Sequence, residues 1–207
     1  MDKLIPFDPT LEQVQQSNKQ AGIPDINVSV THGKLLYLLA KLKGAKNILE
    51  IGTLGGYSSI WMARALSETG KLYTLEFNPE YAKIAEQNIR QAGYQDKVEV
   101  IVGKALDTLP ILEEKKLLFD LIFIDADKEN YSHYLKWSLK LANSGALIIA
   151  DNVVRDGKVF DETSEDVLVK GVQQFMDLLV NNPAIDSTAI QTVGVKGYDG
   201  FMIGIVK

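Results

Sequence analysis

Two aspartates and a lysine follow an apolar run in the middle of the chain. The stretch IFIDADKEN places Asp125, Asp127 and Lys128 directly after residues 121–124. Carboxylates can hold a cation, and a lysine beside a bound cation is favoured as the neutral amine that a general base must be. Although most lysines are merely solvated, this one stands beside the acids. The cluster therefore predicts a chemical site at the end of a buried strand.

A second group of oxygen-bearing side chains ends another apolar run. In GALIIADNV, Asp151 and Asn152 follow residues 146–150. If the two runs are neighbouring strands, Asp125 joins this pair, and two carboxylates and an amide oxygen meet at one edge. Such hard oxygen ligands favour Mg²⁺, and also suit Mn²⁺ or Ca²⁺, over zinc. Two solvated acids at strand ends and an Asn that starts a turn would give the same sequence pattern. The convergence of all three residues favours a metal site.

A glycine-rich stretch, LEIGTLGGYSS, lies between the first predicted strand and a helix. Its spacing, Glu50-x-Gly52-x-x-Gly55, differs from the G-x-G-x-x-G of dinucleotide sites, and Ser58 adds a hydroxyl at the helix start. Glu76 ends the next strand, where an acid can accept hydrogen bonds from both hydroxyls of a ribose. A nucleoside-containing cofactor with a cationic amino group is therefore predicted. A plain turn with two solvated acids is the alternative.

The elements that must position these residues alternate along the chain. Short runs rich in Ile, Val and Leu predict strands covered on both faces, and amphipathic segments between them predict helices. The predicted strands are 47–52, 71–76, 97–102, 119–125 and 145–151. The predicted helices are 57–68, 78–93, 105–114, 130–145 and about 169–182. The pattern predicts an α/β fold, Rossmann-like and doubly wound, with a mostly parallel seven-stranded sheet.

The two ends of the chain carry further predictions. Residues 8–22 predict an N-terminal helix in which Thr10 and Gln13 form a capping box. Stretches 189–195 and 200–206 flank a glycine-rich turn, which predicts an antiparallel C-terminal hairpin. Gly145 and Gly93 are predicted to end helices, and Asn78 to begin one.

The composition restricts the class of protein. The chain has 207 residues, no cysteine, a net charge of −5, and no apolar run long enough to cross a bilayer. Disulfides and cysteine-based zinc sites are thereby excluded. The acidic balance argues against nucleic acid as the main partner, because phosphate binding needs clustered Lys and Arg. We expect a cytoplasmic protein that does not associate with membranes.

These stretches together resemble the metal-dependent O-methyltransferases of the caffeoyl-CoA and catechol type, in their bacterial small-molecule branch. The resemblance begins near residue 8 and rests on VSVTHGKLLYLLAKLKGAKNILEIGTLGGYSSIWMA, IFIDADKENY, IADNVVRDGKV and VGVKGYDGFMIGIV. It implies a single S-adenosylmethionine-dependent methyltransferase domain over 1–207, with an N-terminal helix and cap region at 1–30. It also implies a divalent cation and a homodimer.

The resemblance implies roles position by position. Lys128 matches the catalytic base, beside Asp125. The implied metal ligands are Asp125, Asp151 and Asn152. The implied cofactor contacts are Val28 (through its backbone), Glu50, Gly52, Thr53, Ser58, Glu76, Ala105 and Asp127. Asp156 stands where plant relatives place an Asn that touches substrate, which argues against their acyl-thioester substrate.

The resulting prediction is methylation of one hydroxyl of an aromatic vicinal diol of catechol, caffeoyl or flavonoid type. An alternative on the same fold is a methyltransferase acting on a hydroxylated tRNA base, which needs a basic rim; residues 41–46 are the one obvious basic run. A nicotinamide-dependent oxidoreductase is opposed by the glycine spacing. A non-catalytic binding module is disfavoured by the acids and Lys128.

Overall fold

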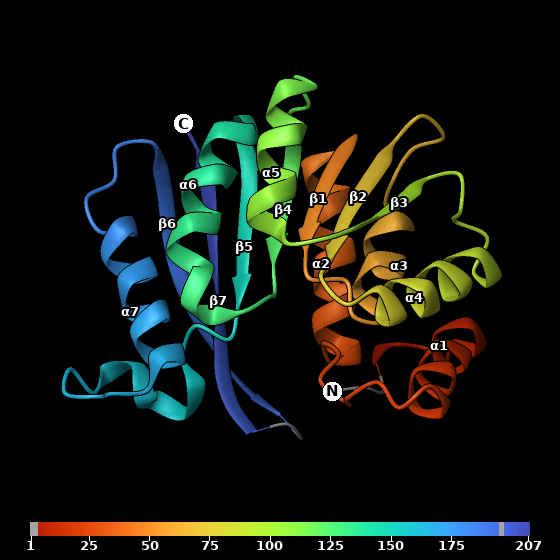
Figure 1. The fold of residues 1–207 in the computed structure, drawn as a ribbon, viewed down its shortest axis with the longest axis horizontal. Helices are drawn as coiled ribbons and strands as arrows, with labels where there is room; N and C mark the ends of the chain where they lie inside the picture. Colours follow the sequence, from red (N-terminus) through yellow and green to blue (C-terminus); the bar gives the residue numbers. More distant parts are fainter. Residues whose placement is uncertain (1–3, 195–196) are drawn as a thin grey trace. The chain divides into compact units, whose positions relative to one another are not determined.

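A computed structural model describes residues 4–194 and 197–207, which form two compact units. The first unit ends at Thr108 and the second begins at Leu109. In each unit, strands alternate with helices (Figure 1), and the described residues contain seven strands. The alternation predicted from the apolar runs is therefore present along the chain.

The first unit contains three parallel strands that lie side by side (Figure 1) in the order β3-β2-β1. They are β1 (Asn47–Ile51), β2 (Lys71–Glu76) and β3 (Val98–Val102). The register pairs Glu50 with Thr74, and Glu76 with Val102. Parallel pairing brings the carboxyl ends of the strands to one edge, so Glu50 and Glu76 lie at or next to that edge.

Helices follow and precede these strands. They are α1 (Pro9–Gln20), α2 (Val30–Lys43), α3 (Tyr57–Ala63), α4 (Pro79–Gln91) and α5 (Ala105–Glu114), the last of which continues into the second unit. Residues 52–56 form the glycine loop between β1 and α3. The side chain of Asn78 caps α4, as predicted, by accepting hydrogen bonds from the amides of Glu80 and Tyr81.

The predicted capping box at the first helix is wrong. The side chain of Asp8 caps α1 by accepting from the amides of Thr10 and Leu11. Pro9 occupies the first helical position, where its fixed φ suits the helix and its missing N–H costs nothing. The Asp-Pro pair therefore starts the helix before Thr10 can cap it.

The second unit contains four strands in the order β4-β5-β7-β6. They are β4 (Phe119–Ile124), β5 (Ala142–Asp151), β6 (Ile185–Gly194) and β7 (Gly197–Val206). β4 and β5 are parallel neighbours, as predicted, whereas β7 is antiparallel to both β5 and β6. The predicted hairpin is therefore present, although residues 195–196 of its turn lie outside the described residues.

Two helices and two 3₁₀ turns complete the second unit. They are η2 (Lys128–Asn130), α6 (Tyr131–Leu141), η3 (Arg155–Phe160) and α7 (Val167–Leu179). α6 and α7 pack against each other (Figure 1). A Cβ at Gly171 of α7 would lie 2.2 Å from the carbonyl oxygen of Lys128. Only glycine lets α7 rest directly on the backbone that carries Lys128.

The predicted helix end at Gly145 is also wrong. α6 ends at Leu141, and β5 begins at once, so Gly145 lies inside the strand with φ of 75°. The strand begins earlier in the sequence than predicted, and in this added stretch the side-chain amide of Asn143 donates to the side chain of Asp120 of β4 over 2.9 Å. The pairing register with β4 shifts in this stretch, which accommodates the glycine. α3 and α7 likewise end earlier than their amphipathic patterns predict.

In the described parts of the chain, no helix combines the length and the apolar character that crossing a bilayer requires.

We predict that Asp8→Ala lowers the free energy of unfolding by about 1 kcal/mol at pH 7, the usual cost of losing a helix N-cap. Asp8 also pairs with Arg64. Asp8→Asn keeps a capping oxygen and loses the charge, so it should cost less. Denaturant unfolding monitored by circular dichroism measures both values.

The pH dependence provides the control. The hydrogen bond from Arg64 is the main cause that holds the pKa of Asp8 below its ordinary 3.8. The stabilisation from the charge is therefore present above pH 3.8 and is lost as pH falls through the lower, folded-state pKa. The gap between wild type and Asp8→Asn should close in that range. Equal stability of Asp8→Ala and wild type at pH 7 would contradict the capping role.

Candidate active site

Asp125, Lys128 and Asp151 meet where β4 and β5 end. The register pairs Ile124 with Ala150, so the two aspartates follow paired positions on parallel strands. The Lys128 ammonium donates to Oδ1 of Asp125 over 3.1 Å, and Asp125 is partly buried. Lys128 and Asp151 are buried, with 8% and 9% of their surface exposed. Two of the three residues predicted to converge, Asp125 and Asp151, thus lie at one edge with Lys128 beside them.

Burial and charge act together on Asp151. Burial, followed by repulsion from Asp125, raises the pKa of Asp151 from 3.8 to about 7. Lys128 lowers this pKa and Asp199 raises it, by smaller amounts. The single positive charge of Lys128 therefore does not offset the burial of Asp151 and its repulsion from Asp125. A cation beside the two carboxylates would favour the ionised form of Asp151.

Tyr131 ties these groups to the strand ends. Its hydroxyl accepts from the Lys128 ammonium over 2.7 Å and donates to the carbonyl oxygen of Asp151 over 2.9 Å. Burial, with repulsion from both aspartates, raises the pKa of Tyr131 well above 10, so the hydroxyl keeps its proton. Tyr131 therefore fixes the position of the Lys128 nitrogen relative to β5.

Asn152 begins an unusual turn after β5. Its φ is 58°, and its backbone amide donates to Oδ1 of Asp151 over 2.8 Å. Its side-chain amide donates to Oδ2 of Asp199, on β7, over 3.1 Å. Asp156, in the same turn, is exposed and also has a positive φ of 56°. Asn152 thus lies beside Asp151, as the predicted ligand set requires.

Within the described residues, no three His, Cys, Asp or Glu side chains form a metal-binding group. The predicted set has two carboxylates and the amide of Asn152, so it is a group of another kind. The site is therefore defined by Asp125, Asp151 and Asn152 together with the neighbouring Lys128.

The glycine loop of the first unit carries the predicted cofactor residues. Gly52 has φ of 101°, a conformation open to glycine, and Thr53 is buried. The carboxylate of Glu76 accepts from the amides of Leu54 and Asn78, each over 2.8 Å. Two amides leave lone pairs on both oxygens, so Glu76 is fixed in place and can still accept from a diol.

Glu50 lies within β1 and is fully buried. Hydroxyl groups surround its carboxylate: Ser58 donates over 2.5 Å, Thr74 over 2.7 Å, and Ser59 also donates. The Thr74 and Thr53 hydroxyls are 2.5 Å apart. These donors satisfy the buried carboxylate of Glu50, beside which the sequence predicts a cationic ligand group. Glu50 also fixes the start of α3 through its serines.

The remaining predicted cofactor residues are more scattered along the chain. Val28 is buried before α2, and Ala105 is the first residue of α5. Asp127 is exposed in the second unit, where its carboxylate accepts from Tyr134 over 2.6 Å and from Asn130. Burial, followed by this hydrogen bond to Asp127, raises the pKa of Tyr134.

Several supporting residues were missed by the sequence reasoning. Asp199 and Tyr131 hold the acidic cluster, and Ser59 and Thr74 hold Glu50. Asn88 donates to the carbonyl oxygen of Gly55 and to the side chain of Asn18, both over 2.9 Å, and so fixes the glycine loop to α1 and α4. Only the position of Asp199 in a Gly-x-Asp-Gly turn could have drawn attention to it.

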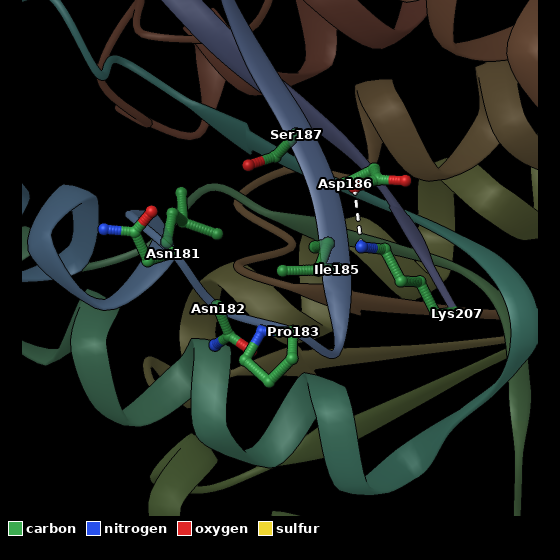
Figure 2. A pocket seen from close by; sticks show the side chains of 8 residues that line it. Asn181, Asn182, Pro183, Ile185, Asp186, Ser187 and Lys207 are labelled. Carbon is green, nitrogen blue, oxygen red and sulfur yellow. Dashed lines mark ion pairs between the residues drawn. The ribbon is translucent and has the colours of Figure 1, made fainter.

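A hollow of about 340 Å³ lies elsewhere in the second unit, where α7 leads into β6. Figure 2 shows its lining, which includes the ion pair between Lys207 and Asp186, 2.9 Å apart. No predicted site residue contributes to this lining. The hollow is polar and open, and it has no part in the candidate site.

Comparisons with known structures give the class of fold. The structure of an O-methyltransferase from Bacillus cereus in complex with SAH superposes with a TM-score of 0.98 at 53% identity, covering 100% of this chain and 94% of that one. An O-methyltransferase of Streptomyces achromogenes involved in tomaymycin synthesis, in complex with SAM, gives 0.95 at 44% identity, covering 100% and 93%. The predicted Rossmann-like α/β fold is confirmed.

The family follows from the sequence matches. A catechol O-methyltransferase of Niastella koreensis is 52% identical over 201 residues, covering 97% of this chain and 91% of that protein. A family model described as O-methyltransferase matches residues 6–202. The chain belongs to the O-methyltransferase family. The predicted enzyme class, an S-adenosylmethionine-dependent O-methyltransferase, is confirmed at the level of that family.

We predict that Asp151→Asn stabilises the metal-free protein at pH 8. A raised pKa means that the folded protein holds a proton that the unfolded chain releases, so this group's contribution to stability falls as pH rises from 3.8 to about 7. Removing the charge removes that loss, which is at most about 4 kcal/mol at about 1.4 kcal/mol per pKa unit.

Thermal unfolding in excess chelator between pH 5 and pH 8 measures this effect. The advantage of Asp151→Asn should grow with pH and level off above about pH 7. A constant difference between the two proteins across the range would contradict the raised pKa.

Proposed function

We propose that this enzyme is a divalent-metal-dependent O-methyltransferase that methylates one hydroxyl of an aromatic vicinal diol. The observation that carries the proposal is the pairing of Asp125 with the buried Asp151, whose pKa is raised to about 7. That pairing lies beside Asn152 and Lys128, so metal-binding oxygens and a base occupy one edge. The relative named above as a catechol O-methyltransferase supports the acceptor class.

The donor set fits a hard dication. Asp125, Asp151 and Asn152 would hold it through oxygen atoms, the ligands that Mg²⁺ prefers, and Mn²⁺ or Ca²⁺ could replace it. Its charge would offset the repulsion that raises the pKa of Asp151. Three protein ligands leave about three octahedral positions, enough for two adjacent hydroxyl oxygens.

The first unit fits S-adenosylmethionine as the methyl donor. Glu76 would accept hydrogen bonds from the ribose hydroxyls, because two backbone amides already hold its carboxylate in place. Glu50 would favour the cationic end of the donor through its buried charge. Gly52, Thr53 and Ser58 shape the loop, and Val28, Ala105 and Asp127 are proposed as further contacts.

The reaction forms an oxygen–methyl bond and breaks a sulfur–methyl bond. When bound, the cation would make a coordinated hydroxyl more acidic, and the donor would supply an electrophilic methyl group. A free phenol has a pKa of about 10 and is a weak nucleophile at neutral pH. Lys128 Nζ, in the neutral form that a nearby dication would favour, would take the hydroxyl proton, and Asp125 and the Tyr131 hydroxyl hold this nitrogen in place. Positioning of the acceptor oxygen can then remove about 7–11 kcal/mol of the barrier.

Other properties stay predictions. A single methyltransferase domain over 1–207 is supported by the family match to residues 6–202. A homodimer and a cytoplasmic location follow from the resemblance and composition. Asp156, in place of the Asn of plant relatives, favours a small free diol over an acyl thioester.

We predict that Asp125→Asn lowers the methylation of catechol at least about 100-fold, because changes even behind a metal ligand cost about 10- to 100-fold. Binding of S-adenosylmethionine should stay within about twofold of wild type. Radiolabelled methyl transfer and calorimetric titration of the donor measure the two effects. Excess EDTA should abolish the wild-type reaction, and added Mg²⁺ should restore it.

Asp186→Asn is the matched control, because Asp186 is exposed on β6 and pairs with Lys207. It should retain wild-type activity. Methylation at the full rate in EDTA, or by Asp125→Asn, would refute the metal-dependent mechanism.

We predict that Lys128→Met lowers kcat by about 10²- to 10⁴-fold, the usual contribution of a general base, and changes KM for the diol much less. Lys136→Met, on the exposed face of α6, is the matched control and should leave kcat unchanged. Steady-state kinetics across pH 6 to 9 measures both. An unchanged kcat for Lys128→Met would remove Lys128 from the reaction.

A further inference from the structure

Asp199 accepts hydrogen bonds from both sides of the turn that carries Asn152. Oδ2 accepts from the side-chain Nδ2 of Asn152 over 3.1 Å. Oδ1 accepts from the backbone amides of Val154, Arg155 and Gly200 over 3.1, 2.8 and 2.9 Å. One carboxylate on β7 therefore holds a side chain and the backbone that follows it.

This contact decides which end of the Asn152 amide faces β7. The oxygen and nitrogen of an amide are nearly identical in size, so packing alone hardly distinguishes them. An ionised carboxylate accepts hydrogen bonds and donates none, so it selects the nitrogen. The Asn152 oxygen is therefore directed away from Asp199.

The backbone of the turn that carries Asn152 is also held by hydrogen bonds to Asp199. Asn152 and Arg155 have φ of 58° and 50°, values that are uncommon for residues other than glycine. The backbone N–H of Asn152 donates to the side chain of Asp151 over 2.8 Å, and the backbone N–H of Arg155 donates to Asp199 over 2.8 Å. The turn is held at its start by Asp151 and across its width by Asp199, so Asn152 has little freedom to rotate.

We propose that Asp199 is a positioning residue that orients the Asn152 amide, so that its oxygen rather than its nitrogen is presented to the divalent cation. This inference rests on the proposed metal-dependent function. It assigns a role to a residue of the C-terminal hairpin that contacts neither the reacting atoms nor the cation.

The isosteric variant Asp199→Asn tests the proposal. One oxygen at position 199 can still accept from the three backbone amides, but an NH₂ group now faces Asn152. Asn152 must then turn its own oxygen towards position 199 and its nitrogen towards the cation. We expect affinity for Mn²⁺, measured by electron paramagnetic resonance titration, to fall about 10- to 100-fold. Affinity for S-adenosylmethionine should change less than twofold, because Asp199 is not among the proposed cofactor contacts.

A reciprocal exchange separates orientation from charge. In the double variant Asn152→Asp with Asp199→Asn, the new amide donates to the new carboxylate, and an oxygen again faces the cation. We expect Asn152→Asp to increase Mn²⁺ affinity at least tenfold more in the Asp199→Asn background than in the wild-type background. An equal gain in both backgrounds would mean that charge alone acts, and would overturn the proposal.

The remaining outcomes are distinct. If the wild type binds Mn²⁺ and Asp199→Asn binds it equally well, the positioning role alone is overturned. A wild type that does not bind Mn²⁺ overturns the proposed function and this inference with it. Asp186→Asn, the same chemical change on the exposed face of β6, should bind Mn²⁺ as wild type does, and thermal unfolding of each metal-free variant checks that it is folded.

Discussion

A buried carboxyl group beside a second carboxylate is costly unless positive charge lies near both. Asp151 and Asp125 follow paired residues of two parallel strands, and the backbone leaves them no means of separating. Lys128 provides one positive charge, yet the pKa of Asp151 is still raised to about 7. The second unit is arranged around this pair: Tyr131 fixes Lys128, Gly171 brings α7 onto its backbone, and Asp199 holds the turn after β5. The packing of these elements stabilises the edge where β4 and β5 end, at which the positive charge of Lys128 alone does not offset the two carboxylates.

Each unit holds two acidic side chains near the ends of its strands, but the groups that surround these side chains differ between the units. In the first, the buried charge of Glu50 is surrounded by hydroxyl donors, and Glu76 is held by backbone amides. These neutral donors hold both carboxylates in place. In the second, burial of Asp151 and its repulsion from Asp125 raise the pKa of Asp151. The first arrangement suits an organic ligand that exchanges in each reaction cycle, whereas the second suits a dication with a small coordination shell.

The positions of the strands and the acids at their ends were predictable, because continuous apolar runs identify covered parallel strands and the residue after each run must emerge at one edge. The supporting residues were not. Thr74 is paired with Glu50 by strand register, and nothing in the local sequence of either residue reveals that pairing. Asp199 acts on a turn more than forty residues earlier in the chain. The helix boundary errors at Thr10 and Gly145 arose where an Asp-Pro start and an Asn143–Asp120 contact overrode local patterns.

Asp151, partly protonated beside Asp125, should become charged when a dication binds. Calorimetric titration of Mg²⁺ at pH 6.5, repeated in buffers with different ionisation enthalpies, measures the proton release that this change requires. With a pKa of about 7 for Asp151, binding should release roughly 0.5–1 proton in the wild type and almost none in Asp151→Asn. Magnesium binding without proton release, or no binding at all, would contradict the account.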